Sequence, residues 1–292
     1  MREENHDPAI AGWATFDYAW THDWFAYQFK ADTQAAGTLG MDDIVAFARD
    51  RLGFTVEASQ LEFLTSTAKR GIVNCSRQWG KSTLGAIKAI YRAWTRPGSL
   101  VLVMSPTRRQ SGLFLAKVRA LGIGSRVAIR KDPDHEMSLR FPNGSLIVGL
   151  PAREANIRGF SAVSMLIIDE AARVPDVAYK AVRPMLAVGN GDLWLLSTPM
   201  GKRGFFHELF VHGGERWARF EVPATACPER ITGAFLEEEL ADMGPSWVKQ
   251  EYFCVFLDSG GSMFDQQLIE DAVTEDVEPY AIPRCSPPGG LR

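Results

Sequence analysis

The stretch Cys75–Thr83, which reads CSRQWGKST, constrains the fold of this chain more than any other. It follows a short apolar run over residues 71–75, which predicts a buried strand, and it precedes residues 84–90, which predict a helix. In a loop between a strand and a helix, the backbone N–H groups of the loop and of the first helical turn point at one spot. The helix dipole adds about half a positive charge there. The stretch therefore predicts an anion-binding loop.

The residue types at the end of this loop favour a triphosphate as the anion. Gly80 lets the backbone approach closely, Lys81 adds a full positive charge, and the Ser82 hydroxyl can ligate Mg²⁺. One position departs from the common pattern Gly-x-x-x-x-Gly-Lys-Ser/Thr, because Cys75 stands where its first glycine is usual. The loop by itself is therefore a partial match that the rest of the chain has to support.

Bulk properties limit what the rest of the chain can be. Its 292 residues are 46% hydrophobic, which is typical of a soluble globular protein with one large domain or two small ones. The net charge of −3 restricts any contact with nucleic acid to a local patch or to a ring built by several copies. The four cysteines form no CxxC pair, and no run of about 18 apolar residues occurs. We therefore predict an intracellular protein without disulfides or a membrane span.

Apolar runs without polar alternation recur between residues 71 and 223. Leu100–Met104 and Met165–Ile168 are of this kind, which indicates strands covered on both faces and hence a mostly parallel sheet in an α/β fold. Phe141–Ser145 carries a hairpin signal, so we expect antiparallel strands at one edge. The predicted strands are 71–75, 99–104, 126–130, 139–141, 145–149, 163–168, 192–197 and 217–222. The predicted helices are 81–95, 107–121, 176–187 and 203–212.

The composition divides the chain into four segments. Residues 1–53 are predicted to form an aromatic-rich helical arm; packing of its aromatic side chains on the main domain is favoured over docking of a partner. Residues 54–223 are the predicted α/β core, and residues 224–275 a helical lid or linker. Residues 276–292 are rich in proline and glycine, which predicts a linker or a frayed end.

Two carboxylates, Asp169 and Glu170, directly follow the apolar run Met165–Ile168. Ligands of open parallel sheets bind at the carboxyl ends of the strands, where this pair is expected. The first carboxylate can hold Mg²⁺, and the second can polarise an attacking water. Solvated acids at the end of a strand are the alternative, but the anion-binding loop upstream favours the catalytic interpretation.

Weaker signals lie at other strand ends. Ser197 and Thr198 follow an apolar strand, where a hydroxyl could sense a γ-phosphate, although Thr-Pro is also a common turn. Arg108 and Arg109 either reach the ligand side of the sheet or are solvated at a helix start. Arg158 could contact a phosphate in its own subunit or in a neighbour, or could be a surface arginine at a turn.

This constellation resembles the ATPase half of the large terminase subunit of tailed phages, the motor that packages viral DNA. In that family the phosphate loop commonly reads Ser-Arg-Gln-x-Gly-Lys-Ser/Thr without the first glycine, and Ser76–Ser82 fits this form. Asp169 and Glu170 match the family's Walker B motif and catalytic glutamate, and Leu196–Pro199 matches its coupling motif. The resemblance covers roughly residues 54–265.

Two further positions carry the resemblance. Arg158 matches an arginine of an Arg-Gly element usually found just before Walker B, and Gln60 lies where these motors place an adenine-reading glutamine. An amide can read adenine because it both donates to and accepts from the edge of the base. The fold implied is a P-loop NTPase of the RecA-like ASCE type, a mostly parallel central sheet flanked by helices with added antiparallel edge strands.

The resemblance also implies roles in binding and hydrolysing ATP. Lys81 would bind the β- and γ-phosphates, Ser82 with Asp169 would hold Mg²⁺, and Glu170 would activate water. Arg77 would neutralise the transition state from within the same subunit, or Arg158 would do so from the next one, a contribution of about 10³- to 10⁵-fold in related systems. The residues expected to contact the nucleotide are Gln60, Ser76, Arg77, Gln78, Trp79, Gly80, Lys81, Ser82 and Thr83.

The implied partners are double-stranded DNA, a portal protein and a small terminase subunit, in the cytoplasm of an infected bacterial host. We expect a homo-oligomeric ring when the motor is assembled and a monomer in isolation. Candidate DNA contacts are Arg108, Arg109, Lys202 and Arg203. The family also carries a C-terminal nuclease of ribonuclease-H type, for which the 27 residues after Asp265 are too few. We therefore expect residues 276–292 to lead to a missing nuclease domain, and cleavage to be absent.

Two other functions compete with that of a packaging motor. A helicase-like DNA-remodelling ATPase has similar strand-end motifs, but it needs a second RecA-like domain for which no room remains. A P-loop scaffold that binds nucleotide without hydrolysis is the other alternative, and the presence of Lys81, Asp169 and Glu170 argues against it.

Overall fold

The computed structural model describes residues 43–125, 127–133, 135–153 and 159–258. The chain divides into two compact units, Met1–Leu257 and Asp258–Arg292, and every described residue except Asp258 belongs to the first. Most of the predicted aromatic arm and the whole tail therefore lie outside the described residues. Within the described ranges, no helix is long and apolar enough to cross a bilayer.

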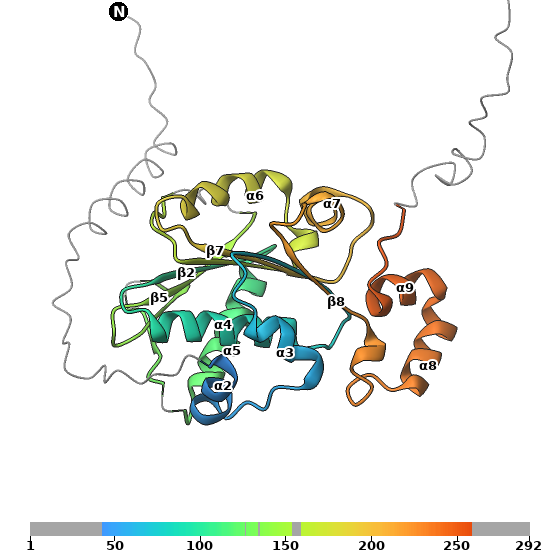
Figure 1. The fold of residues 1–292 in the computed structure, drawn as a ribbon, viewed down its shortest axis with the longest axis horizontal. Helices are drawn as coiled ribbons and strands as arrows, with labels where there is room; N and C mark the ends of the chain where they lie inside the picture. Colours follow the sequence, from blue (N-terminus) through green and yellow to red (C-terminus); the bar gives the residue numbers. More distant parts are fainter. Residues whose placement is uncertain (1–42, 126, 134, 154–158, 259–292) are drawn as a thin grey trace, which may run out of the picture. The chain divides into compact units, whose positions relative to one another are not determined.

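An eight-stranded sheet forms the centre of the described unit. Its strands are β1 (Arg70–Cys75), β2 (Leu100–Ser105), β3 (Arg130–Lys131), β4 (Ser138–Arg140), β5 (Leu146–Pro151), β6 (Met165–Asp169), β7 (Asp192–Ser197) and β8 (Ala218–Val222). They are ordered β3-β4-β5-β2-β6-β7-β1-β8 in space (Figure 1). The neighbouring strands β5-β2-β6-β7-β1-β8 all pair in parallel, whereas β3–β4 and β4–β5 are antiparallel. The predicted mostly parallel sheet with antiparallel edge strands is confirmed.

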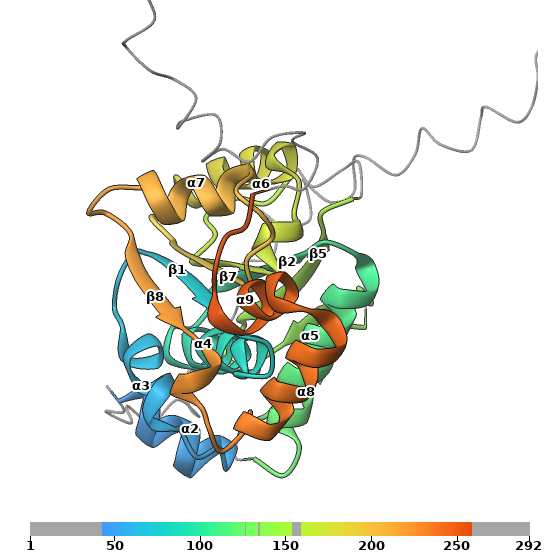
Figure 2. The ribbon, with the colours of Figure 1, turned by 90° about the vertical axis from the view of Figure 1, so that its right-hand side faces the viewer.

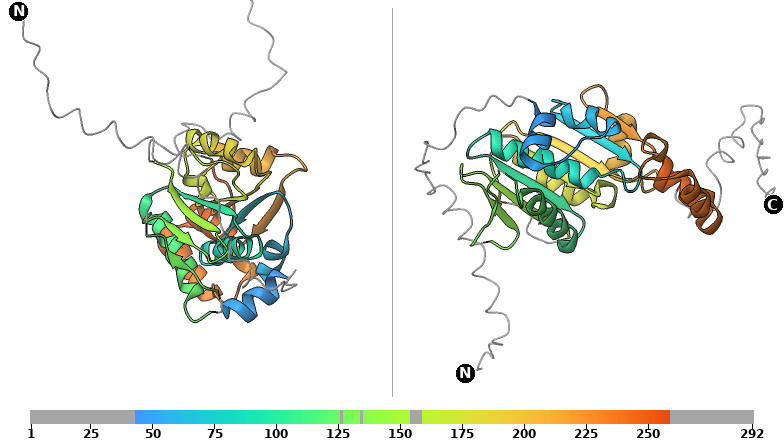
Figure 3. Two further views of the ribbon diagram at one scale, coloured as in Figure 1. Left: turned by 90° about the vertical axis from the view of Figure 1, so that its left-hand side faces the viewer. Right: turned by 90° about the horizontal axis from the view of Figure 1, so that it is seen from below.

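Helices cover both faces of this sheet (Figure 1, Figure 3). One face carries α2 (Ile44–Leu52), α3 (Ala58–Thr65), α4 (Lys81–Thr95) and α5 (Arg108–Gly122), and the other carries α6 (Asp176–Val182) and α7 (Gly204–His212).

Alternate residues of each central strand enter two separate hydrophobic layers. In β2, Val101 and Val103 pack in the layer under α4 and α5, whereas Leu102 and Met104 pack in the layer under α6 and α7. Because both layers are covered, both faces of the strand are apolar, and its sequence shows no polar alternation.

Two predicted elements differ from the observed ones. The strand expected over residues 126–130 is observed only as β3. This strand lies at the edge of the sheet, has β4 as its single neighbour and pairs only with Leu139 and Arg140. The helix expected over residues 176–187 ends at Val182 and continues as a 3₁₀ turn. Pro184 lacks the N–H that an α-helical bond would need there.

After β8 the chain forms two helices that pack on each other, α8 (Gly233–Met243) and α9 (Pro245–Phe253) (Figure 2). None of the residues of α8 is buried, whereas α9 buries three, including Glu251. The end of α9 is tied to the sheet, because Asn74 Nδ2 in β1 donates to the carbonyl oxygen of Cys254 at 2.7 Å. This contact keeps α9 beside the carboxyl end of β1.

Candidate nucleotide-binding site

The loop between β1 and α4 contains two residues with left-handed backbone conformations. Gly80, which directly precedes α4, has a φ of 102°, and Gln78 has a φ of 62°. Residue 80 is a glycine because residues with a Cβ rarely adopt that conformation. Its carbonyl oxygen accepts hydrogen bonds from the N–H groups of Thr83 at 2.9 Å and Leu84 at 3.0 Å. These bonds start α4 at the predicted phosphate-binding position.

Cys75, the irregular residue of the predicted pattern, is the fully buried last residue of β1. It pairs with Val222 of β8, and its Sγ lies 3.8 Å from the carbonyl oxygen of Ser197. Burial raises the pKa of its thiol to about 12, so the thiol is neutral at pH 7. The position that is glycine in the common pattern is therefore a packed strand end in this chain.

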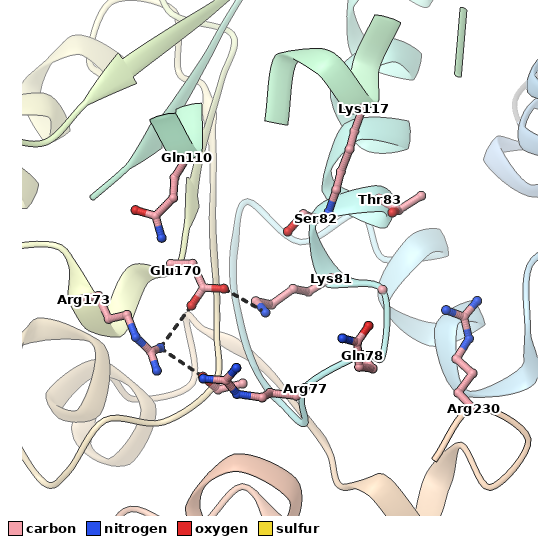
Figure 4. Close-up of a pocket in the computed structure, with 12 residues that line it drawn as sticks. Arg77, Gln78, Lys81, Ser82, Thr83, Gln110, Lys117, Glu170, Arg173 and Arg230 are labelled. Carbon is pink, nitrogen blue, oxygen red and sulfur yellow. Dashed lines mark hydrogen bonds and ion pairs between the residues drawn. The ribbon is translucent and has the colours of Figure 1, made fainter. Parts of the chain in front are cut away.

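A cavity of about 490 Å³ lies beside the loop, at the carboxyl ends of β1, β6 and β7 (Figure 4). It is lined by Arg77, Gln78, Gly80, Lys81, Ser82, Thr83, Gln110, Lys117, Glu170, Arg173, Thr198 and Arg230. Five of these side chains are cationic, whereas only Glu170 is anionic. The cavity therefore attracts a polyanion such as a nucleotide triphosphate.

Glu170 lies between two cations of the cavity (Figure 4). Its Oε1 is 2.9 Å from Lys81 Nζ, and its Oε2 accepts a hydrogen bond from Arg173 Nη1 at 3.1 Å. Burial acts to raise the pKa of Glu170, but Lys81, Arg173 and Arg77 lower it below its ordinary value. Burial likewise acts to lower the pKa of Lys81, and Glu170 raises it. Both groups are therefore ionised at neutral pH.

Asp169 and Ser82 supply oxygen atoms suited to Mg²⁺. Asp169 is the buried last residue of β6, and its Oδ1 accepts a hydrogen bond from Ser82 Oγ at 3.2 Å. Burial raises the pKa of Asp169 to about 6, and a divalent cation would favour its ionised form. Among the described residues, no group of three or more His, Cys, Asp or Glu could hold a metal ion. One carboxylate and one hydroxyl nevertheless fit Mg²⁺, whose other ligands are commonly substrate phosphates and waters.

Arg77 lines the cavity, but α9 holds its guanidinium. Arg77 Nε lies 2.5 Å from Glu251 Oε2, and the guanidinium carbon lies 5.5 Å from the ring centre of Trp247. The backbone N–H of Arg77 also donates to the carbonyl oxygen of Glu251 at 2.9 Å. The Glu251 side chain is only 1% exposed, so Arg77 compensates a buried carboxylate.

Three predicted nucleotide contacts, Gln60, Ser76 and Trp79, are fully buried behind the loop and do not line the cavity. Gln60 Nε2 donates to the carbonyl oxygen of Trp79 at 3.0 Å, and Gln60 Oε1 accepts from the N–H of Glu57 at 3.2 Å. Trp79 Nε1 donates to Ser59 Oγ at 3.2 Å. These contacts support the loop from behind, and adenine reading by Gln60 stays a prediction.

The predicted coupling residues connect the end of β7 to the segment after Glu170. Ser197 Oγ accepts a hydrogen bond from the N–H of Ala172 at 3.1 Å. Thr198 Oγ1 accepts one from Arg173 Nη1 at 3.0 Å and faces the cavity. These two bonds connect the end of β7 directly to the segment after Glu170, and a coupling role for Ser197 and Thr198 stays a prediction.

The structure does not bring the remaining predicted site residues to the cavity lining as far as they are described. Arg158 lies outside the described residues. Arg108 forms an exposed ion pair with Glu136, in which Nη2 lies 2.7 Å from Oε2. None of Arg108, Arg109, Lys202 and Arg203 lines the cavity. Their contact with DNA stays a prediction.

Five residues around the site were not predicted from the sequence: Gln110, Lys117, Arg173, Arg230 and Glu251. Gln110 and Lys117 are seven positions apart on α5, a spacing that places both on one helix face and could have indicated them. Glu251 is 174 positions from its partner Arg77, and no local pattern predicts such a pairing.

Comparisons with known proteins agree with one another. A family model described as terminase large subunit, T4likevirus-type, N-terminal, matches residues 72–271. The terminase large subunit of Thermus virus P23-45 is 30% identical over 192 residues, which is 59% of this chain and 39% of that protein. The chain thus spans well under half the length of this curated relative.

Two solved structures have the same fold. The large terminase ATPase domain of Thermus phage P74-26 has a TM-score of 0.59 at 27% identity, over 70% of this chain and 96% of that one. The large terminase of another thermophilic bacteriophage, in complex with ATP-gamma-S, has a TM-score of 0.59 at 14% identity, over 72% of this chain and 56% of that one. At that identity, the second likeness concerns the fold alone.

Proposed function

Because this chain belongs to the terminase large-subunit family, we propose that it is the ATPase motor domain of a DNA-packaging terminase. In this role it hydrolyses ATP with Mg²⁺ and uses the energy to move double-stranded DNA into a procapsid. The observation that carries the proposal is the convergence of Lys81 and Glu170 on one cationic cavity, with Asp169 hydrogen-bonded to Ser82 of the cavity lining. The P74-26 relative is an ATPase domain, which supports the same activity here.

Binding of ATP rests on the loop and on the first turn of α4. The N–H groups at this helix start and the ammonium of Lys81 would hold the β- and γ-phosphates. Ser82 and Asp169 would hold Mg²⁺, which supplies charge neutralisation on the phosphate oxygens. Arg230 also lines the cavity, on the other side of the loop from Glu170 (Figure 4), where its Nε donates to Glu57 Oε1 at 2.7 Å.

Hydrolysis requires Glu170 to leave Lys81. A triphosphate competes for the same ammonium, so Glu170 is released when ATP binds. Its carboxylate then accepts a proton from a water whose oxygen attacks the γ-phosphorus. The bond from that phosphorus to the bridging oxygen breaks, and the products are ADP and inorganic phosphate.

An arginine completes the charge neutralisation. Arg77 supplies it from within the subunit once its guanidinium leaves Glu251, or Arg158 supplies it from a neighbouring copy.

Assembly into a ring on a portal protein, together with a small terminase subunit, follows from a packaging role, as does a location in the cytoplasm of the infected host. Arg108, Arg109, Lys202 and Arg203 remain the candidate DNA contacts. That this chain does not cleave DNA stays a prediction.

Replacement of Glu170 by Gln tests this function. The amide keeps the size of the side chain but cannot accept the proton, so we expect turnover to fall by at least about 10²-fold. ATP-gamma-S affinity, measured by calorimetry with Mg²⁺, should stay near that of the wild type. Glu237→Gln, at an exposed position of α8, is the matched control and should hydrolyse ATP normally. Full hydrolysis by Glu170→Gln would remove Glu170 from its role, and a wild type that neither binds nor hydrolyses ATP would overturn the proposed function.

A further inference from the structure

Arg173 fixes Glu170 through both its backbone and its side chain. The N–H of Arg173 donates to the carbonyl oxygen of Glu170 at 2.9 Å, and Arg173 Nη1 donates to Glu170 Oε2 at 3.1 Å. Glu170 has a φ of 55°, in the left-handed region that residues with a side chain rarely adopt. Such a conformation persists only where neighbouring contacts hold it, and Arg173 provides two of them.

The same guanidinium contacts two other elements. Arg173 Nη1 donates to Thr198 Oγ1 at 3.0 Å, directly after β7, and Arg173 Nη2 donates to Glu251 Oε1 at 3.4 Å, on α9. One planar group therefore joins the end of β6, the end of β7 and α9. Its side chain is 26% exposed at the cavity wall, so these contacts lie at the reaction site (Figure 4).

The charges around Glu170 and Glu251 give Arg173 a separate role from the other cations. Lys81 contacts Glu170, and Arg77 contacts Glu251, but the proposed function gives both of these cations to the phosphates. Arg173 contacts both carboxylates at once. When ATP draws the other two cations away, Arg173 is the described cation still in contact with both carboxylates.

We propose that Arg173 is a positioning residue for hydrolysis: it aims the Glu170 carboxylate and links that aim to Thr198 and, through Glu251, to α9. This inference rests on the proposed ATPase function and deepens it. It makes Glu170, Thr198 and α9 one mechanical unit, so that a displacement of α9 or of the end of β7 redirects the carboxylate.

Arg173→Gln, Arg173→Lys and wild type are compared in steady-state hydrolysis and in ATP-gamma-S binding. We expect Arg173→Gln to lower kcat roughly 10- to 100-fold, because a misplacement of about 1 Å can cost that much. ATP-gamma-S affinity should change less than about threefold, since a positioning residue acts on the transition state and not on ground-state binding. Arg173→Lys keeps the charge but loses the planar fork, so it should recover only part of kcat.

Arg119→Gln is the matched control, because Arg119 is exposed on α5 and does not line the cavity. A wild-type kcat in Arg173→Gln would overturn the inference. An equal loss of kcat and of ATP-gamma-S affinity in the Arg173 variants would overturn it as well, since Arg173 would then bind the phosphates. A wild type without hydrolysis would overturn the proposed function, and the inference with it.

A double-mutant cycle with Thr198→Val tests the link itself. If Arg173 and Thr198 act as one unit, their combined effect on kcat is smaller than the product of the two single effects. Independent, multiplicative effects would overturn the link. Should Arg173→Gln fail to fold, the cycle is built from Arg173→Lys, a milder change that keeps the cation.

Discussion

Arg77 is the residue whose observed contact differs most from its proposed role. Its guanidinium binds Glu251 and lies over Trp247, whereas transition-state neutralisation requires it at the γ-phosphate. The ion pair has a charged partner that is nearly fully buried, so leaving it is costly unless another cation stays with Glu251. Arg173 contacts the same carboxylate and meets that requirement.

Arg77→Ala should lower ATP turnover by at least about 10³-fold, and equally at every protein concentration, because an arginine of the loop acts within its own subunit. The measurement is the turnover rate per subunit across a dilution series, for Arg77→Ala, Arg158→Ala and wild type. Loss of activity in Arg158→Ala, combined with a wild-type rate that rises steeply with concentration, would instead assign the arginine to a neighbouring copy.

At the scale of elements, helix α4 begins and ends where the sequence predicts. The expected bounds, residues 81–95, are those observed, because Gly80 precedes the helix and Arg96-Pro97-Gly98 follows it. The arrangement of the strands also explains why Lys81 meets Glu170. Lys81 follows β1 and Glu170 follows β6, and the carboxyl ends of parallel strands lie at the same edge of the sheet.

Helix α4 also carries a buried lysine that makes its packing sensitive to pH. Lys88 is 5% exposed, its Nζ donates to the carbonyl oxygen of Ser66 at 2.9 Å, and it lies 4.2 Å from the ring centre of Trp194. Burial, reinforced by the charge of Arg92, lowers the pKa of Lys88 to about 7. In the unfolded chain the same lysine takes up its proton at a much higher pH, near 10.5.

The free energy of unfolding should therefore rise between about pH 7 and 10, because the unfolded chain binds one more proton there than the folded chain. Lys88→Met should remove up to about 1.4 kcal/mol per pH unit of this rise. Urea denaturation at several pH values measures it, with Lys180→Met, an exposed lysine of α6, as the control. Parallel curves for wild type and Lys88→Met would show that Lys88 keeps its proton when folded.

Contacts between distant elements are what the sequence could not predict. Arg77, Lys81 and Glu170 belong to short contiguous motifs whose chemistry depends on local spacing. Glu251 pairs with Arg77 only because α9 returns to the end of β1, and that return depends on packing over the whole chain. Gln60 differs from these motif residues. A glutamine amide is suited to reading adenine, but the Gln60 side chain is buried behind the loop, where hydrogen bonds to Glu57 and Trp79 occupy both its oxygen and its nitrogen.

At the scale of the whole molecule, the resemblance to terminase large subunits is confirmed by the family model over residues 72–271. The irregular loop with Cys75, the pair Asp169-Glu170 and the stretch Leu196–Pro199, together with Arg158 and Gln60, carry that resemblance in the sequence. The net charge of −3 restricts DNA to a local surface or to a ring of copies, so a DNA effect on turnover should depend on salt and on assembly.

ATP turnover by wild type and by Glu170→Gln, measured with and without duplex DNA over a range of protein concentration, decides whether this chain is a DNA-dependent ATPase. We expect Mg²⁺-dependent turnover per subunit by wild type that increases with duplex DNA, and none above background in Glu170→Gln. Turnover that is the same with and without DNA at every concentration would contradict a DNA motor. Turnover that survives in Glu170→Gln would contradict the site.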